Sequence, residues 1–264
     1  MKPIIFQFNP PEWMSFLPDT VTIHSYGFMI GLGIVFSYLL AVQLGKSLKV
    51  DSDKTATLFF WVFLASVVGG KIFFYFENPD IYFENPSKMI TKPGGGFVFY
   101  GSLIFAIPTL VWYLRKSKIA VWDYLDIVAI YGPLLHLFGR MGCFMAGCCH
   151  GKACSPEYGI IFSDPATKAN PMNTPVYPTQ LYSIFLLLGI ILFLYFFRNK
   201  KKFAGQMFLI YVITYSIGRG IIEIFRGDEA RGYIIDRILS HSQLIALILV
   251  AITAVFYWKR SKKA

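Results

Sequence analysis

Charged residues are scarce in this chain of 264 residues: they make up 15% of it, whereas hydrophobic residues make up 55%. An ordinary soluble domain carries about 25% charged residues, so the composition excludes that class. The apolar residues also gather into stretches of roughly 20, the length that a helix needs to cross a lipid bilayer. We therefore predict an all-α polytopic membrane protein.

We also expect no cleavable signal and no soluble domain at either end, and we find no internal repeat or low-complexity tract. Met1-Lys2-Pro3 leads into a short apolar patch that Asn9-Pro10-Pro11 interrupts, with no small-residue cleavage site. We expect a single integral membrane domain over residues 1–264, in which outer loops 147–176 and 226–241 form a small extracytoplasmic cap.

Seven membrane spans are predicted from the apolar stretches. They cover residues 24–44, 56–76, 96–114, 122–146, 177–197, 205–225 and 242–258. One side of the membrane, counted with the start of the fourth span, carries 14 Lys and Arg against 4 Asp, and such a bias marks the cytoplasm. The N-terminus is then outside and the C-terminus inside. Because this side accounts for the whole formal charge of +10, the charge requires no nucleic acid as a partner.

Acidic residues are few within the spans, and this shortage leaves two arginines without enough partners. Arg140 lies in the outer half of the fourth span and Arg219 in that of the sixth, with only Glu223 near enough to offset them. An arginine in a bilayer costs at least about 2.5–3.5 kcal/mol, so each should have a partner. A self-neutralising Arg219–Glu223 pair is the plain alternative, and an anion from a ligand is the simplest further partner.

The four cysteines, which the topology places on the outer side, do not have the paired C-x2-C spacing of a structural zinc site. They are Cys143, Cys148, Cys149 and Cys154. The spacing favours one or two disulfides over a metal site, and a free reactive thiol is the third possibility.

These motifs together resemble those of bacterial prolipoprotein diacylglyceryl transferases. The family's glycine-arginine signature is similar to Gly139-Arg140-Met-Gly142-Cys143-Phe144-x-x-Gly147, which Gly151 follows. Other family blocks are matched in the right order by Tyr26-Gly27, Gly69-Gly70-Lys71, Tyr177-Pro178-Thr179-Gln180-Leu181-Tyr182 and Tyr215-x3-Arg219-x3-Glu223-x2-Arg226.

The resemblance implies a multi-pass enzyme of the bacterial cytoplasmic (inner) membrane. Such an enzyme moves the diacylglyceryl group of phosphatidylglycerol to the thiol of a cysteine in the signal segment of a lipoprotein precursor, and releases glycerol phosphate. The partners it implies are these two substrates and membrane lipids, with no metal and no organic cofactor. The catalytic residues it implies are Arg140, Arg219, Tyr100 and Glu223. The substrate-binding residues are Tyr26, Gly101, Ser102, Gly142, Cys143, Gly147, Gly151, Gln180, Tyr215 and Arg226.

The chain departs from the family pattern at three places. The family usually has asparagine at the position of Cys143 and glutamate at that of Cys148. Its His-Gly-Gly corresponds here to Tyr100-Gly101-Ser102, so the family's histidine is replaced. Either another group, such as Tyr100, His136 or His150, helps to remove the thiol proton, or the chain is a divergent member with an altered substrate or chemistry. We favour the same chemistry, because the arginines that would hold the phosphate are present.

Two functions from other classes remain as alternatives. An anion transporter or channel would line its path with the same arginines, but the inner halves of the spans carry almost no ionisable groups except near their ends. A membrane thiol oxidoreductase would use the four outer cysteines.

Overall fold

The structure is a computed structural model of the chain, and it describes residues 1–11, 13, 20–79, 96–226, 233–235 and 239–263. Much of the predicted outer loop 226–241 lies outside the described residues. The described residues divide into two compact units, Met1–Leu40 with Leu125–Ala264 (the first unit) and Ala41–Tyr124 (the second unit).

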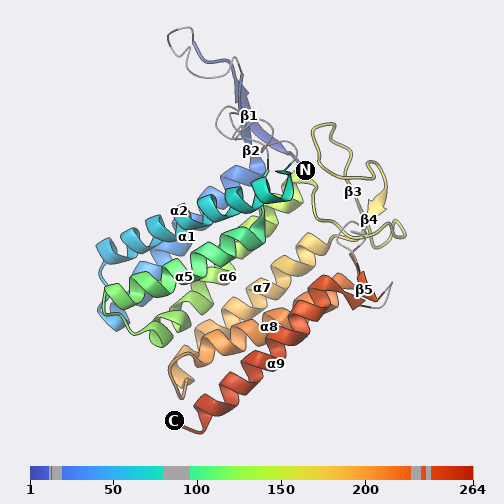
Figure 1. Cartoon of the computed structure of the whole chain (residues 1–264). Helices are drawn as coiled ribbons and strands as arrows, with labels where there is room; N and C mark the ends of the chain where they lie inside the picture. The colour runs from blue at the N-terminus through green and yellow to red at the C-terminus, as the bar shows by residue number, and fades with distance from the viewer. Residues whose placement is uncertain (12, 14–19, 80–95, 227–232, 236–238, 264) are drawn as a thin grey trace. The chain divides into compact units, whose positions relative to one another are not determined.

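Long helices occupy all seven predicted spans (Figure 1). Each has at least 18 residues: α1 Ser25–Gly45, α2 Ser52–Glu77, α5 Phe99–Lys116, α6 Val121–Ala146, α7 Thr179–Phe197, α8 Gln206–Glu223 and α9 His241–Ser261. Within the described residues, five of them are long and apolar enough to cross a membrane: α1, α2, α6, α7 and α9. The polytopic membrane class is therefore confirmed, while the count of seven spans and their orientation stay predictions.

Side chains at the helix starts explain where several helices begin. Asp51 precedes α2 and accepts a hydrogen bond from the backbone N–H of Lys54 at 2.7 Å. This bond is the main reason that the pKa of the Asp51 carboxyl lies below its ordinary value. Ser240 precedes α9 and forms a reciprocal capping box with Gln243. Such caps satisfy backbone donors that the helices leave without an internal partner.

In the first unit, α7, α8 and α9 lie side by side (Figure 1), and α1 contacts α6. The hydroxyl of Ser37 donates to the carbonyl of Tyr131 at 3.1 Å, so the two helices are joined within their apolar lengths. One turn earlier, a Cβ added to Gly33 would lie 2.7 Å from the Cβ of Phe138. Glycine is therefore needed there for the helices to approach.

A buried carboxylate, Asp126, fixes the start of α8 against α6. It is 3% exposed, and its two oxygens accept from the backbone N–H groups of Gly205, Met207 and Phe208 at 2.9–3.2 Å. The ammonium of Lys201 lies 3.0 Å from it. A negative charge at a helix N-terminus is favourable, so Asp126 acts as a remote cap for α8. The sequence predicted no catalytic role for Asp126. Its role in the structure is to cap the start of α8.

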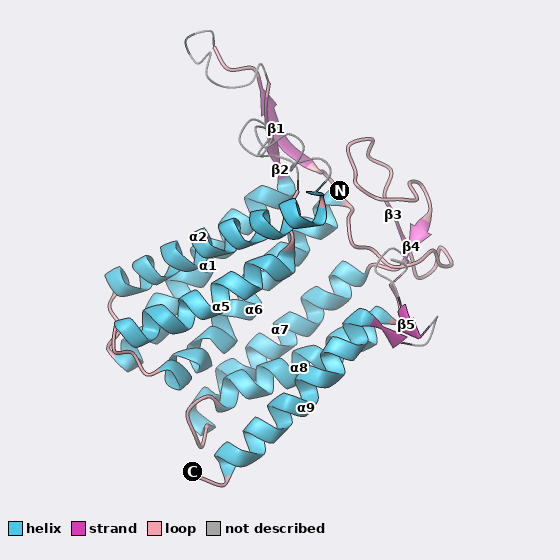
Figure 2. Cartoon of the chain, viewed as in Figure 1, coloured by secondary structure: helices cyan, strands magenta, loops and turns pink. Residues whose placement is uncertain are grey.

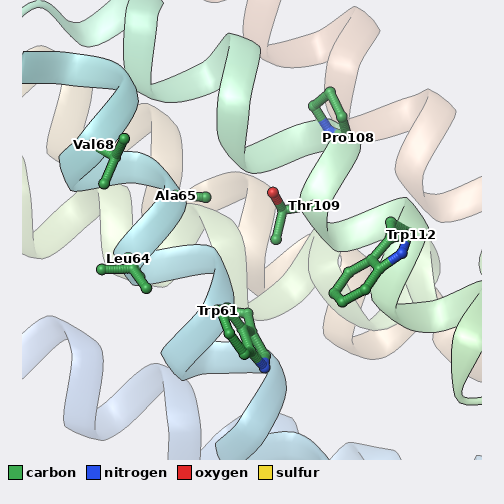
Figure 3. Close-up of a pocket in the computed structure, with 7 residues that line it drawn as sticks. All are labelled: Trp61, Leu64, Ala65, Val68, Pro108, Thr109 and Trp112. Carbon is green, nitrogen blue, oxygen red and sulfur yellow. The ribbon is translucent and has the colours of Figure 1, made fainter. Parts of the chain in front are cut away.

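The second unit is built on close packing of α2 against α5. A Cβ on Gly69 would lie 2.4 Å from the carbonyl oxygen of Gly101, and a Cβ on Gly101 would lie 2.5 Å from that of Gly69. Between the same helices lies an apolar groove of about 400 Å³ (Figure 3). Its walls are Trp61, Leu64, Ala65, Val68, Pro108, Thr109 and Trp112. None of these side chains is ionisable, so the groove offers no charge for an anion.

Three short antiparallel pairs of strands lie in the loops of the first unit (Figure 2). They are β1 Ile4–Phe8 with β2 Val21–His24, β3 Ile160–Ile161 with β4 Pro175–Val176, and β5 Tyr233–Ile235 with β6 Leu239–Ser240. The β3–β4 pair belongs to the predicted outer loop 147–176 and helps to order it.

Candidate active site

Arg140 lies near the end of α6 and has an imidazole as its partner. Its Nε donates to Nε2 of His136, one turn earlier, at 3.2 Å. The same imidazole meets the ring of Tyr215 on α8 edge to face, with ring centroids 5.2 Å apart. Among the described residues, Arg140 forms no ion pair with a carboxylate. Its positive charge is therefore left without an acidic partner, as the sequence predicted.

Arg219 lies one turn after Tyr215 on α8 and pairs with Glu223, so the predicted ion pair is confirmed. Glu223 also has an oxygen 3.9 Å from Nε of Arg226 and accepts from the hydroxyl of Ser240 at 3.5 Å. The Arg219 and Glu223 side chains are only 13% and 8% exposed. One carboxylate thus holds Arg219 in place and lies beside a second guanidinium.

The two arginines belong to one cluster. His136 contacts Arg140 directly and Tyr215 by its ring, and it lies within electrostatic range of both Arg140 and Arg219. Glu223 pairs with Arg219 and also lies beside Arg226, so among the described residues no carboxylate pairs with Arg140 and its positive charge is in excess. A partly buried excess charge of this kind suits an anionic group of a ligand.

The segment after α6 brings three thiols together. The helix ends at Ala146, so Gly147 lies just beyond it, with a φ of +76°. Cys149 also has a positive φ, +64°, which is unusual for a residue with a side chain. The sulfur atoms of Cys143, Cys148 and Cys149 all lie within 4.8 Å of one another.

All four cysteines are free thiols in the structure, which corrects the preference for disulfides drawn from their spacing. Hydrogen bonds from the thiols of Cys143 and Cys148, and then the charges of Arg226 and Arg140, hold the pKa of the Cys149 thiol below its ordinary value.

Two buried side chains from the start of α7 hold this segment. Gln180, 0% exposed, donates from Nε2 to the carbonyl of Cys148 at 2.8 Å, and Thr179 donates to that of Cys149 at 2.8 Å. Sequence reasoning predicted Gln180 as a headgroup ligand but did not select Thr179. The signal was available, because a threonine after a proline at a helix start commonly satisfies nearby backbone groups. The side-chain oxygen of Gln180 is buried and has no hydrogen-bond partner among the described residues.

Tyr26 and Gly142 lie together beside the thiols. A Cβ on Gly142 would lie 3.1 Å from the Cα of Tyr26, so glycine lets the start of α1 approach α6. Tyr26 lies within electrostatic range of Arg140 and of the three clustered cysteines. These two predicted site residues therefore join the cluster.

Gly151 connects the thiol segment to the end of α8. It forms an antiparallel backbone bridge with Arg226, and its N–H donates to the carbonyl of Tyr177 at 2.7 Å. A Cβ there would lie 2.3 Å from the carbonyl oxygen of Phe225. The residue thus has a packing reason to be glycine, beyond its predicted contact with substrate.

The predicted residues Tyr100, Gly101 and Ser102 belong to the second unit. Tyr100 is 55% exposed, while Ser102 is buried and Gly101 packs against Gly69. Their predicted roles toward substrate stay predictions.

The fold and this cluster define a polytopic membrane protein whose polar site combines arginines, one glutamate and thiols. The chain matches the family of prolipoprotein diacylglyceryl transferases over residues 13–259, and it belongs to that family.

Curated relatives agree with this assignment. The chain is 36% identical over 231 residues to phosphatidylglycerol–prolipoprotein diacylglyceryl transferase 2 of Clostridium perfringens, covering 86% of this chain and 87% of the relative. It is 32% identical over 252 residues to a phosphatidylglycerol–prolipoprotein diacylglyceryl transferase of Clostridium tetani, covering 96% and 95%. A Listeria welshimeri protein of the same name is 31% identical over 255 residues, covering 94% and 90%.

Proposed function

We propose that this chain transfers the diacylglyceryl group of phosphatidylglycerol to the cysteine thiol of a lipoprotein precursor and releases glycerol phosphate. Family membership supports the reaction. The structural observation that supports it best is the Arg140 guanidinium, which has an imidazole as its partner and, in the part of the chain that the structure describes, no carboxylate. A lipid phosphate supplies the missing negative charge.

The arginines act on the phosphate. Arg140 and Arg219 bind its oxygens and stabilise the negative charge that grows as the carbon–oxygen bond to glycerol phosphate breaks. The thiol of the precursor loses its proton to a base, and the resulting thiolate forms the new carbon–sulfur bond. Glu223 is a positioning residue, because its ion pair fixes the guanidinium of Arg219.

Other side chains hold the lipid and the precursor. We infer that Tyr26 and Tyr215 contact the headgroup beside the arginines, and that the unpartnered oxygen of Gln180 accepts a hydrogen bond from a glycerol hydroxyl. Gly101, Ser102, Gly142, Gly147 and Gly151 are proposed to let substrate approach the backbone, and Cys143 and Arg226 to border it.

We further propose the seven-span topology, with the N-terminus outside, the C-terminus inside and the site toward the outer side of the cytoplasmic membrane. Supporting this, long helices occupy all seven apolar stretches, and the basic residues follow the bias of cytoplasmic segments. Neither a transporter nor a thiol oxidoreductase is favoured, because the curated relatives bear the name of a transferase.

The decisive test supplies the purified protein with phosphatidylglycerol and a precursor peptide that contains the signal cysteine. We expect the peptide to gain the mass of one diacylglyceryl group by mass spectrometry, with an equal amount of glycerol phosphate released. A peptide with serine at that position is the control and should stay unmodified, because its hydroxyl is a far weaker nucleophile. Release of phosphate-containing product without peptide modification would contradict the proposal.

Tyr100 is the proposed base or part of its proton path. Removing its hydroxyl in Tyr100→Phe should lower the transfer rate by about 10²-fold, a usual contribution of acid–base catalysis. Tyr100→His should retain transfer, because imidazole accepts a proton more readily. The control is Tyr158→Phe, which changes a loop tyrosine that is 66% exposed. Equal rates for Tyr100→Phe and the unmodified protein would show that Tyr100 is not the base, and His136 and His150 would then be the candidates.

A further inference from the structure

Three thiols from two short segments form a compact group in the first unit. Cys143 lies in the last turn of α6, and Cys148 and Cys149 lie in the segment that follows. Their sulfur atoms lie within 4.8 Å of one another. Thiolates on one zinc ion, each about 2.3 Å from the metal, lie roughly 3.8 Å apart in a tetrahedral site. The three sulfurs therefore need only small movements to share an ion.

The backbone that carries these thiols is held in an uncommon conformation. The positive φ of Cys149 is disfavoured for a residue with a Cβ, so surrounding contacts must maintain it. Thr179 and Gln180 provide them through hydrogen bonds to the carbonyls of Cys149 and Cys148. Both side chains are at most 1% exposed, which makes these bonds hard to exchange with water. The thiols are thus positioned in advance, as a binding site requires.

The surrounding charges suit a thiolate–metal group. Three thiolates and a divalent ion carry a net charge of −1. Arg140 lies one helical turn before Cys143, and Arg226 is bridged to Gly151, two residues after Cys149. These cations offset the negative charge of such a group.

Within the described residues, the group contains three ligands and no fourth. Nδ1 of the neighbouring His150 lies 2.7 Å from the carbonyl oxygen of Gly151, and Cys154 is not in the group. Structural zinc sites have four protein ligands, whereas catalytic ones have three and an open position.

We propose that Cys143, Cys148 and Cys149 bind one thiophilic metal ion, Zn²⁺, and leave its fourth coordination position for the thiol of the precursor. The fourth position rests on the proposed function, whereas the three-sulfur site does not. On binding, the precursor thiol loses its proton to the base and its sulfur coordinates the zinc. The sulfur then forms the bond to carbon as the bond from carbon to the phosphate oxygen breaks, and the zinc keeps its charge throughout.

This proposal replaces two expectations, since the cysteine spacing favoured disulfides over a metal site and the family resemblance implied no metal. The spacing did not reveal the site because the ligands follow no C-x2-C pattern. The positive φ of Gly147 and Cys149 is what turns the chain after α6.

The first measurement is metal content. Full-length protein in detergent is stripped with a chelator, given Zn²⁺ and washed, and bound zinc is determined by mass spectrometry. We expect about one zinc per chain, with X-ray absorption showing sulfur neighbours at about 2.3 Å. Cys143→Ser and Cys148→Ser should weaken zinc binding at least 10-fold, whereas the matched control Cys154→Ser should not. An absorption spectrum without sulfur neighbours in the unmodified protein overturns the site, whether or not the variants fold.

The second measurement concerns the open position. Co²⁺ replaces zinc, and the sulfur-to-cobalt absorption is recorded with the cysteine peptide and with its serine counterpart. We expect the cysteine peptide to raise this absorption by about a third, as three sulfur ligands become four, and the serine peptide to leave it unchanged. An unchanged spectrum with both peptides overturns the open position. Zinc bound as expected without any diacylglyceryl transfer would instead overturn the proposed function and leave the three-sulfur site standing.

Discussion

Arg140→Ala and Arg219→Ala are each expected to lower the transfer rate at least ~10³-fold, because a guanidinium that stabilises a transferring phosphate is commonly worth that much. Arg140 has no carboxylate partner among the described residues, so its removal leaves no acidic group unpaired in the protein. Its loss should therefore act on catalysis more than on folding. Arg219→Ala frees Glu223 and should add some instability. The measurement is glycerol phosphate release per minute by purified protein of equal monodispersity.

Lysine variants and a distant arginine provide the controls. Arg140→Lys keeps the charge but loses the planar pair of donors, so it should retain partial activity. Arg198 lies just after the end of α7, and its guanidinium stacks over the ring of Tyr195 at 3.9 Å. The thiol segment is held by the opposite end of this helix, so Arg198→Ala should leave the rate within twofold. Full activity in both Arg140→Ala and Arg219→Ala would refute the phosphate-binding role of the arginines.

Asp126→Asn is expected to lower the free energy of unfolding by about 3 kcal/mol, the scale of a buried charge network that loses one partner. The substitution keeps the shape but replaces one oxygen by a donor. The amide nitrogen that takes the place of Oδ2 would then face two other donors, the N–H of Gly205 and the ammonium of Lys201. The effect should appear as a lower midpoint of thermal unfolding in detergent.

Two comparisons separate the helix cap from the ion pair. Lys201→Ala should cost less than Asp126→Asn, because its side chain is 32% exposed and water screens the pair. The exposed Asp53, in the first turn of α2, is the control, and Asp53→Asn should change stability by no more than about 0.5 kcal/mol. Equal midpoints for Asp126→Asn and Asp53→Asn would show that the buried carboxylate does not hold α8.

The helices were accessible from the sequence because runs of about 20 apolar residues have few other stable arrangements in a membrane. The Arg219–Glu223 pair was equally accessible, since residues four apart share a helical face. Both inferences need only local spacing.

The thiol group and the cap by Asp126 were not accessible in this way. Gln180 holds the carbonyl of Cys148 from 32 residues away, and Asp126 caps a helix that starts about 80 residues later. The cysteine segment also depends on positive φ values, which no apolar pattern encodes. Sequence spacing favoured disulfides there because it cannot report where the chain turns.

The backbone bridge between Gly151 and Arg226 joins the segment that carries the thiols to the end of the helix that carries Arg219 and Glu223. Cys149 lies two residues before one end of this bridge, and Glu223 lies three residues before the other. An insertion or deletion in either short interval would shift the sulfurs against the guanidiniums. Substitutions of side chains in these two intervals are therefore tolerated more easily than changes of length, because a change of length in one interval would displace both the thiols and the arginines.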